Sequence, residues 1–218
     1  MTTVAVVDYG MGNLRSVAKA LEHVAPDARI CITASAQEIA DADRVVVPGQ
    51  GYLPDCMREL DRRGLRDVVI HAAATKPFLG ICIGLQMLFG ESEEGGIEDK
   101  ARGLEILPGR VPRFPASTME INGGGRLKVP HMGWNNVYQC DHTHPLWAGI
   151  TDASRFYFVH SYYVAPTLTK LAASTSDYGI RFTSAVSREN IFAVQFHPEK
   201  SAQAGLQLLS NFMQWNPG

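Results

Sequence analysis

One short segment, residues 78–89 (FLGICIGLQMLF), constrains the fold of this chain more than any other. Its first five residues form an apolar run, which is typical of a strand that is covered on both faces. Cys82 ends that run, with Gly80 and Gly84 two residues away on either side. Because glycine permits a tight turn and a close approach of the backbone, the pattern predicts a strand that passes directly into a helix. In open α/β sheets, this carboxyl end of a strand is where ligands bind.

The rest of the first half alternates between apolar runs and apolar residues at helical spacing. Apolar runs predict strands, and the 3.6-residue period predicts the helices between them. The expected strands are 4–8, 29–33, 44–47 and 78–82, and the expected helices are 14–24, 53–60 and 65–74. Since strand–helix–strand units form parallel pairs with right-handed crossovers, the pattern predicts an α/β fold with a mostly parallel central sheet flanked by helices.

This alternation ends after Glu94. Turn-forming residues are frequent in 95–115 and 122–126, and no helices separate the strands expected at 156–159, 171–174, 184–187 and 192–196. We interpret these strands as an antiparallel C-terminal extension of the same sheet, closed by a helix at 203–215. Residues 117–126, with three consecutive glycines, are expected to form a surface loop. Since no internal repeat divides the sequence, we predict a single domain over residues 1–218.

Composition excludes several classes of function. The chain has 218 residues with 45% hydrophobic and 19% charged, and its formal net charge is −2 with no basic block, which argues against nucleic-acid binding. No apolar run approaches the ~20 residues of a membrane span, and the N-terminal residues do not have the pattern of a signal peptide. Four widely spaced cysteines without a C-x-x-C pair are expected to be reduced thiols. We therefore predict a cytoplasmic protein that binds no membrane.

A second segment, residues 192–201 (FAVQFHPEKS), supplies the groups that a thiol nucleophile requires. A cysteine at a helix N-terminus meets the positive end of the helix dipole, which favours the thiolate. His197 and Glu199 stand at i and i+2 of an extended chain, so their side chains point to the same side about 6.6 Å apart along the backbone. Glu199 can then orient one ring nitrogen of His197 while the other faces Cys82. The alternative is a buried structural cysteine and a strand-end histidine without catalytic roles.

Residues 45–51 (VVVPGQG) predict where the N–H donors for acyl transfer lie. Gly49, Gln50 and Gly51 follow a strand that comes one helical crossover before Cys82. A parallel sheet places this loop beside the Cys82 turn, and glycine lets the backbone direct its N–H groups toward a ligand. Taken alone, the Pro-Gly-x-Gly pattern indicates only a turn.

Two further patterns that could indicate a cofactor or a metal do not have the residues these sites need. Residues 10–13 (GMGN) lack the third glycine of a dinucleotide-binding loop, because position 15 is Arg15, and no acidic residue ends the strand at 29–33. His142 and His144 are separated by one residue but have no third ligand at suitable spacing. We therefore predict neither a cofactor nor a metal, and we interpret residues 10–13 as a docking or structural turn.

Together these segments resemble the class I (triad) glutamine amidotransferases. The glycines around Cys82, with Gln86, match the nucleophile motif of that family, and residues 197–199 match the other two members of the triad in order and separation. Further segments resemble the glutaminase subunits of imidazole glycerol phosphate synthase, and these are 8–14 (DYGMGNL), 130–135 (PHMGWN), 160–162 (HSY) and 198–201 (PEKS). The resemblance spans nearly the whole chain.

The resemblance implies a single-domain class I glutamine amidotransferase fold and a division of labour between two subunits. It implies that Cys82 is the nucleophile, His197 the general base and acid, and Glu199 the orienting carboxylate in the hydrolysis of L-glutamine through a thioester. Residues 49–51 would hold the oxyanion. The ammonia would pass to a (β/α)₈ cyclase subunit, which forms imidazole glycerol phosphate and the by-product AICAR in histidine biosynthesis.

The resemblance also implies roles in binding. Gln86 and Glu94 would contact the α-carboxylate and α-amino end of glutamine, with the backbone of Ser161 and Tyr162. The residues implied to face the partner are Asn13, Pro130, His131, Met132, Gly133, Trp134, Asn135 and Lys200. The family pattern leads us to expect a small apolar residue at position 50, where this chain has Gln50.

Three other functions remain as alternatives. A glutaminase of another pathway is disfavoured by residues 130–135 and by the N-terminal signature. A cysteine peptidase is disfavoured because Gln86 and Glu94 suit a free amino acid better than a polypeptide. A catalytically silent scaffold that only binds a barrel partner is opposed by the intact set of Cys82, His197 and Glu199.

Overall fold

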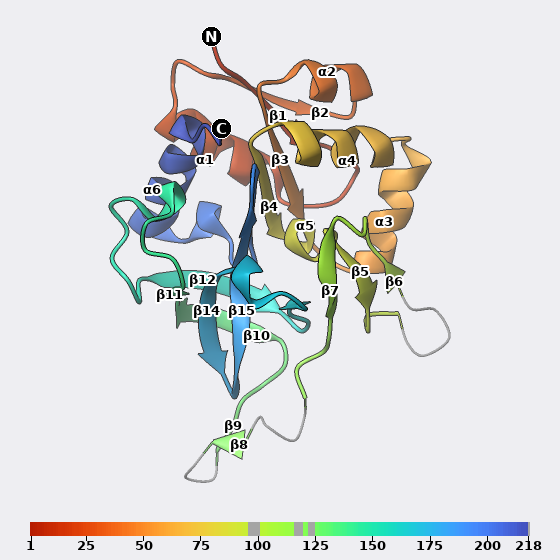
Figure 1. The fold of residues 1–218 in the computed structure, drawn as a ribbon. Coiled ribbons are helices and arrows are strands. Elements are labelled where there is room, and N and C mark those ends of the chain that lie inside the picture. The colour runs from red at the N-terminus through yellow and green to blue at the C-terminus, as the bar shows by residue number, and fades with distance from the viewer. Residues whose placement is uncertain (96–100, 116–119, 122–124, 218) are drawn as a thin grey trace.

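The computed structural model describes residues 1–95, 101–115, 120–121 and 125–217. The described residues form an eight-stranded sheet with the order β11-β14-β15-β16-β4-β3-β1-β2 (Figure 1). Its parallel part contains β1 (Thr3–Val7), β2 (Arg29–Thr33), β3 (Arg44–Gly49), β4 (Phe78–Cys82) and β16 (Ile191–Val194). Its antiparallel part contains β11 (Tyr138–Gln139), β14 (Ala172–Tyr178) and β15 (Ile180–Arg188). The predicted α/β fold with an antiparallel extension is confirmed.

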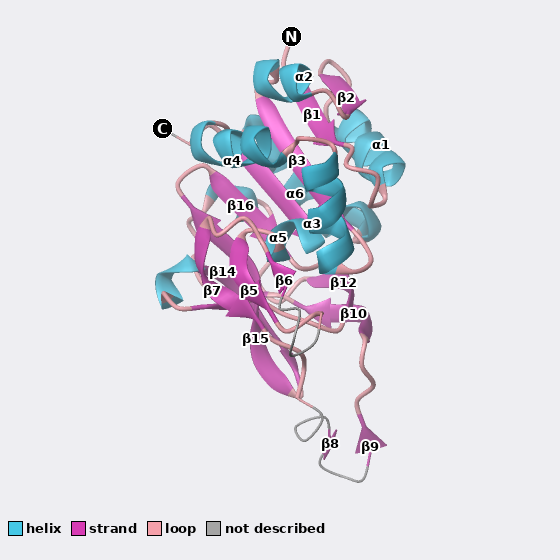
Figure 2. Cartoon of the chain, turned by 90° about the vertical axis from the view of Figure 1, so that its right-hand side faces the viewer, coloured by secondary structure: helices cyan, strands magenta, loops and turns pink. Residues whose placement is uncertain are grey.

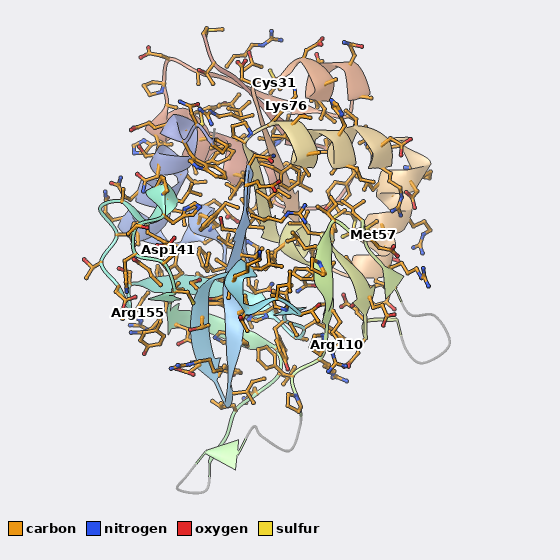
Figure 3. The ribbon with its side chains drawn as sticks, in the orientation of Figure 1. Cys31, Met57, Lys76, Arg110, Asp141 and Arg155 are labelled. Carbon is orange, nitrogen blue, oxygen red and sulfur yellow. The ribbon has the colours of Figure 1, made fainter. Side chains whose placement is uncertain are left out.

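Helices cover both faces of the parallel part, as Figures 1 and 2 show. One face carries α1 (Leu14–Val24) and α6 (Ala202–Gln214), which pack against each other. The other carries α2 (Ala36–Asp41), α3 (Leu53–Arg62) and α4 (Arg66–Thr75). Because both faces are covered, β3, β4 and β16 are buried along their whole lengths, which explains their continuous apolar runs. Charged side chains such as Arg110, Asp141 and Arg155 lie at the exposed periphery (Figure 3).

Two smaller sheets lie below the carboxyl ends of the parallel strands (Figure 1). One has the order β13-β7-β5-β6 and contains β5 (Phe89–Ser92), β6 (Ala101–Arg102), β7 (Leu107–Val111) and β13 (Ala165–Pro166). The other pairs β10 (His131–Asn136) with β12 (Arg155–His160). The prediction that the strand at 156–159 joins the large sheet is therefore wrong, since it pairs with residues 131–136 instead.

Several other differences concern short elements. Helix α2 is not among the predicted helices, although its cap Ser35 accepts a hydrogen bond from the Glu38 backbone N–H at 3.3 Å, which is a common signal of a helix start. The surface loop expected at 117–126 lies mostly outside the described residues, which include only the strand pair β8 (Glu120–Ile121) and β9 (Gly125–Arg126). Strands from both halves of the chain share the large sheet, which supports the single-domain prediction.

No helix in the described parts of the chain has the length and hydrophobicity that crossing a membrane requires.

Candidate active site

The turn after β4 has the geometry that the glycine pattern predicts. Cys82 is the last residue of β4 and the N-cap of the short helix α5 (Ile83–Gln86), and its φ of 56° lies in the left-handed region that non-glycine residues rarely adopt. Gly84 is required here because a Cβ at that position would lie 1.8 Å from the Val47 carbonyl oxygen. Strain of this kind persists only where the surrounding structure enforces it, and it is frequent at reactive residues.

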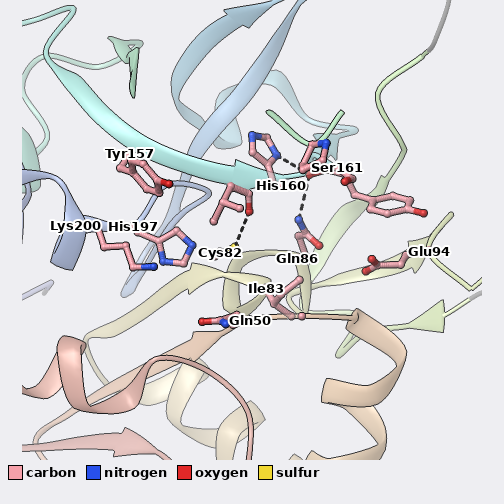
Figure 4. Close-up of a pocket in the computed structure, with 14 residues that line it drawn as sticks. Gln50, Cys82, Ile83, Gln86, Glu94, Tyr157, His160, Ser161, His197 and Lys200 are labelled. Atoms are coloured by element: carbon pink, nitrogen blue, oxygen red, sulfur yellow. Dashed lines mark hydrogen bonds between the residues drawn. The ribbon is translucent and has the colours of Figure 1, made fainter. Parts of the chain in front are cut away.

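The chain places His197 and Glu199 in the same site. Strand β16 pairs in parallel with β4, so the segment that follows β16 emerges beside the Cys82 turn. His197 Nδ1 lies 2.9 Å from Glu199 Oε1, and both side chains are almost fully buried, at 3% and 1% exposed. His197 Nε2 is buried and has no hydrogen bond to another group among the described residues. Its ring lies beside Cys82 in the cavity (Figure 4).

The charges around His197 favour its protonated form. Burial by itself lowers the pKa of the ring, but the negative charge of the Cys82 sulfur and, after it, the Glu199 carboxylate outweigh burial and raise the pKa to about 10. The imidazolium is therefore the stable form of the His197 ring in this site. A thiol nucleophile with a histidine that an acid orients can attack a carbonyl carbon and then donate a proton to the leaving group.

The predicted oxyanion loop lies next to this turn. Gly49 pairs with Cys82 in the register of β3 and β4, and Gln50 and Gly51 line the cavity. Two side chains hold the loop, since the Tyr9 hydroxyl donates to the Pro48 carbonyl at 2.8 Å and the Cys56 thiol lies 3.7 Å from the Gln50 carbonyl. The loop is therefore fixed directly beside the Cys82 turn and along the cavity.

The cavity has a volume of about 360 Å³, enough for a small amino acid, and Gln86, Glu94, Ser161 and Tyr162 line it. Gln86 Nε2 donates to the Tyr162 carbonyl at 3.2 Å, while Gln86 Oε1 is buried with no hydrogen-bond partner among the described residues. Glu94 Oε2 accepts a hydrogen bond from the Leu53 N–H at 2.9 Å, and burial raises the pKa of Glu94. The end of the cavity away from Cys82 thus offers oxygen acceptors to a ligand (Figure 4).

The residues expected to face a partner do not all reach the surface. Met132 and Trp134 on β10 are exposed at 63% and 44%, and Pro130 and Lys200 line the cavity. Asn13, Gly133 and Asn135 are partly exposed. His131 corrects the expectation, because its side chain is 3% exposed and hydrogen bonds to His160 inside the protein. The alternation of side chains along a strand explains this, since His131 and Met132 point to opposite faces.

Sequence reasoning missed two groups that the structure brings to this site. Gln195 is fully buried, and its side chain contacts both Cys82 and Gln86. It stands two residues before His197 in an extended segment, so the period of two could have indicated that both face the same way. The sequence assigns no role to His160 beyond its place in the 160–162 segment, whereas the structure shows it donating to the Tyr162 carbonyl that anchors Gln86.

Comparison with known proteins identifies the class of protein that this fold and site define. The sequence model of the family described as glutamine amidotransferase class-I matches residues 5–215. The chain therefore belongs to the class-I glutamine amidotransferase family.

Relatives narrow this assignment. The imidazole glycerol phosphate synthase subunit HisH of Aromatoleum aromaticum is 65% identical over 217 residues, and that of Nitrosospira multiformis is 63% identical over 217 residues, with all of both chains covered in each case. Within the class-I family the chain thus belongs with the HisH subunits.

Two solved structures share the fold of this chain. The structure of PurLQS from Thermotoga maritima matches with a TM-score of 0.69 at 15% identity, covering 98% of each chain. The glutaminase domain of Trypanosoma brucei CTPS, solved with bound acivicin, matches with a TM-score of 0.63 at 16% identity, covering 99% of this chain and 95% of that one. At these identities, both likenesses show the fold alone.

Proposed function

We propose that this chain is the glutaminase subunit of an imidazole glycerol phosphate synthase and hydrolyses L-glutamine to glutamate and ammonia for histidine biosynthesis. The observation that carries the proposal is the convergence of Cys82, on its strained turn, with the buried pair of His197 and Glu199 in one cavity. The full-length similarity to curated HisH subunits supports the assignment to this enzyme.

The proposed chemistry follows from the positions of these groups. The Cys82 sulfur attacks the side-chain amide carbon of glutamine, and N–H groups of residues 49–51 and of helix α5 stabilise the oxyanion. The His197 imidazolium protonates the departing nitrogen, so ammonia leaves and a thioester remains. Neutral His197 then takes a proton from water, which attacks the thioester and releases glutamate. Glu199 keeps the ring oriented through both steps.

The polar end of the cavity suits the amino-acid end of the substrate. The unpartnered Gln86 Oε1 is an acceptor, and it can bind the α-ammonium group of glutamine together with the Glu94 carboxylate. The backbone of Ser161 and Tyr162, which also line the cavity, contributes further hydrogen bonds. Filling a buried, unsatisfied acceptor removes a penalty of about 1–3 kcal/mol, which favours ligands with a donor at this position.

We further propose that the ammonia goes to a cyclase subunit with a (β/α)₈ barrel fold, and that the complex is cytoplasmic. The exposed Met132 and Trp134 on β10 support a partner on this side of the cavity, because large apolar side chains at the surface are typical of interfaces. The remaining members of the proposed partner-facing set are exposed or partly exposed, and these are Asn13, Pro130, Gly133, Asn135 and Lys200.

The proposal is tested by the variant Cys82→Ala, measured as glutaminase turnover in the complex with the cyclase subunit. Loss of the nucleophile should reduce turnover by ~10⁴ to 10⁶-fold. The matched control is Cys140→Ala, which removes an exposed thiol outside the cavity and should leave turnover unchanged. Near-normal turnover of Cys82→Ala would refute the proposal.

A further inference from the structure

Gln195 occupies an unusual place, because one buried amide spans the whole of the short helix that presents the nucleophile. It directly follows β16, and its backbone N–H donates to the Ser184 carbonyl at 2.8 Å. Its side-chain Nε2 lies 3.7 Å from the Cys82 sulfur, and its Oε1 lies 3.1 Å from Gln86 Nε2. The side chain is therefore held at both ends of α5, next to the reacting atom at one end and the substrate-binding amide at the other.

The hydrogen bonds fix which end of the Gln195 amide faces the sulfur. The Tyr162 carbonyl can only accept, so the Gln86 group that contacts it must be the NH₂ group. The same NH₂ group then needs an acceptor in Gln195, which directs Gln195 Oε1 toward Gln86 and Gln195 Nε2 toward Cys82. A donor thus points at the sulfur.

A donor at this position favours one protonation state of the sulfur. The sulfur also lies 4.0 Å from the Val159 carbonyl oxygen, and a carbonyl can accept from a thiol but only repels a thiolate. The Gln195 N–H instead stabilises the thiolate, since a hydrogen bond to the charged form favours that form. Because both groups are buried, water does not weaken this contact.

We propose that Gln195 is a further catalytic residue of this site, whose side-chain N–H stabilises the Cys82 thiolate while its carbonyl oxygen holds Gln86 in its substrate-binding position. This inference rests on the proposed function, because it assigns Gln195 a role in the same reaction. The other titratable groups whose charges act on the sulfur are His197 after β16, Tyr9 after β1 and Cys56 on α3.

Two substitutions of similar size separate the two contacts of Gln195. Gln195→Met removes both the donor and the acceptor. Gln195→Glu keeps an oxygen for Gln86 but places a second oxygen against the sulfur. The control is Ser184→Ala, which removes a buried hydroxyl paired with Ser174 at 2.9 Å on the neighbouring strand and leaves the sulfur contact intact.

The experiment measures alkylation of Cys82 by iodoacetamide in the full chain, followed by mass spectrometry of the Cys82 peptide from pH 5 to 10. One hydrogen bond to a charged group corresponds to a factor of about 10 to 100 in an equilibrium constant. Cys82 in Gln195→Met should therefore be alkylated about 10- to 100-fold more slowly at pH 7, and the plot of alkylation rate against pH should move to higher pH. Alkylation of Cys82 in Gln195→Glu should be slower still. In the complex, Gln195→Glu should lower kcat for glutamine by about 100-fold or more while KM stays within about threefold.

Alkylation of both variants at the wild-type rate and with the wild-type pH profile would overturn this inference. A purely structural role predicts a lower unfolding temperature with an unchanged profile, as expected for Ser184→Ala. If Cys82→Ala loses turnover while both Gln195 variants alkylate normally, the proposed function stands and only the role of Gln195 falls. If Cys82→Ala keeps its turnover, the proposed function itself fails.

Discussion

The cavity has two walls that belong to different sheets. The turn wall, residues 47–51 and 80–84, is fixed by backbone contacts within the parallel sheet, where the register places Gly49 beside Cys82. The strand wall, residues 130–135 and 157–162, is formed by the antiparallel pairing of β10 with β12 and contains a buried 2.8 Å contact between the side chains of His131 and His160. The turn wall carries the proposed nucleophile and the strand wall carries exposed apolar side chains, so the proposed chemistry and the proposed docking surface are supported by separate sets of contacts.

The largest effect is expected from a change that breaks the turn wall. Gly84→Ala places a methyl group where the Val47 carbonyl oxygen is only 1.8 Å away, so β3 and α5 must separate. We expect a loss of about 3 kcal/mol or more in the free energy of unfolding, and loss of fast Cys82 alkylation. Urea denaturation and peptide mass spectrometry measure both quantities.

The control for this change is Gly90→Ala, where the added methyl group meets only the flexible side chain of Glu105 at 3.3 Å. A loss of stability in Gly84→Ala no larger than that in Gly90→Ala would show that backbone contact does not determine the turn wall.

A change of pH should act on the strand wall and leave the turn wall in place. Burial lowers the pKa of His131 to about 4, and burial with the neighbouring His131 lowers that of His160 to about 3, whereas an unfolded histidine titrates near 6.5. Both rings are therefore neutral in the fold, and their contribution to stability is complete above pH 6.5 and is lost as the pH falls toward 4.

From pH 7 to pH 5 we expect this pair to account for about 3 to 4 kcal/mol of lost unfolding free energy. The double variant His131→Gln/His160→Gln should lose correspondingly less over the same range, as measured by urea denaturation at both pH values. Equal losses of unfolding free energy in the variant and the wild type would show that His131 and His160 do not cause the pH dependence.

The smallest effect on the chain itself is expected from Trp134→Ala. Its side chain is 44% exposed, so the free energy of unfolding should change by no more than about 0.5 kcal/mol. Binding to the cyclase subunit should weaken by about tenfold or more, because large aromatic side chains dominate interfaces. Titration calorimetry with the cyclase checks the second value.

Leu168→Ala removes a side chain of similar exposure, 47%, outside β10 and serves as the control. An unchanged affinity of Trp134→Ala for the cyclase subunit would show that the exposed side chain of Trp134 on the strand wall is not part of the docking surface.

The difference between the walls also explains how much could be predicted from the sequence. The turn wall depends on local patterns, such as Gly84 after an apolar strand, and on the order of strands in a parallel sheet, which brings Gly49 to Cys82. The long separation of Cys82 from His197 along the chain did not prevent this prediction, since β16 pairs directly with β4.

The strand wall could not be predicted in the same way. Its pairing joins residues 131–136 to 155–160 in a separate small sheet, and the alternation of apolar residues alone does not say which partner a strand selects. The burial of His131 and the contact of Gln195 with the sulfur depend on the same long-range packing, and so neither role could be assigned from the sequence.

The left-handed backbone at position 82 and the raised pKa of His197 have a practical consequence. A Cys82→Ser chain would keep the shape of the turn, but an alcohol gives up its proton far less readily than a thiol, so the imidazole would lose the neighbouring anion that keeps it protonated. Under the proposed function, such a chain is expected to bind the amide substrate without consuming it. It is therefore the form of choice for crystallising the intact substrate in place.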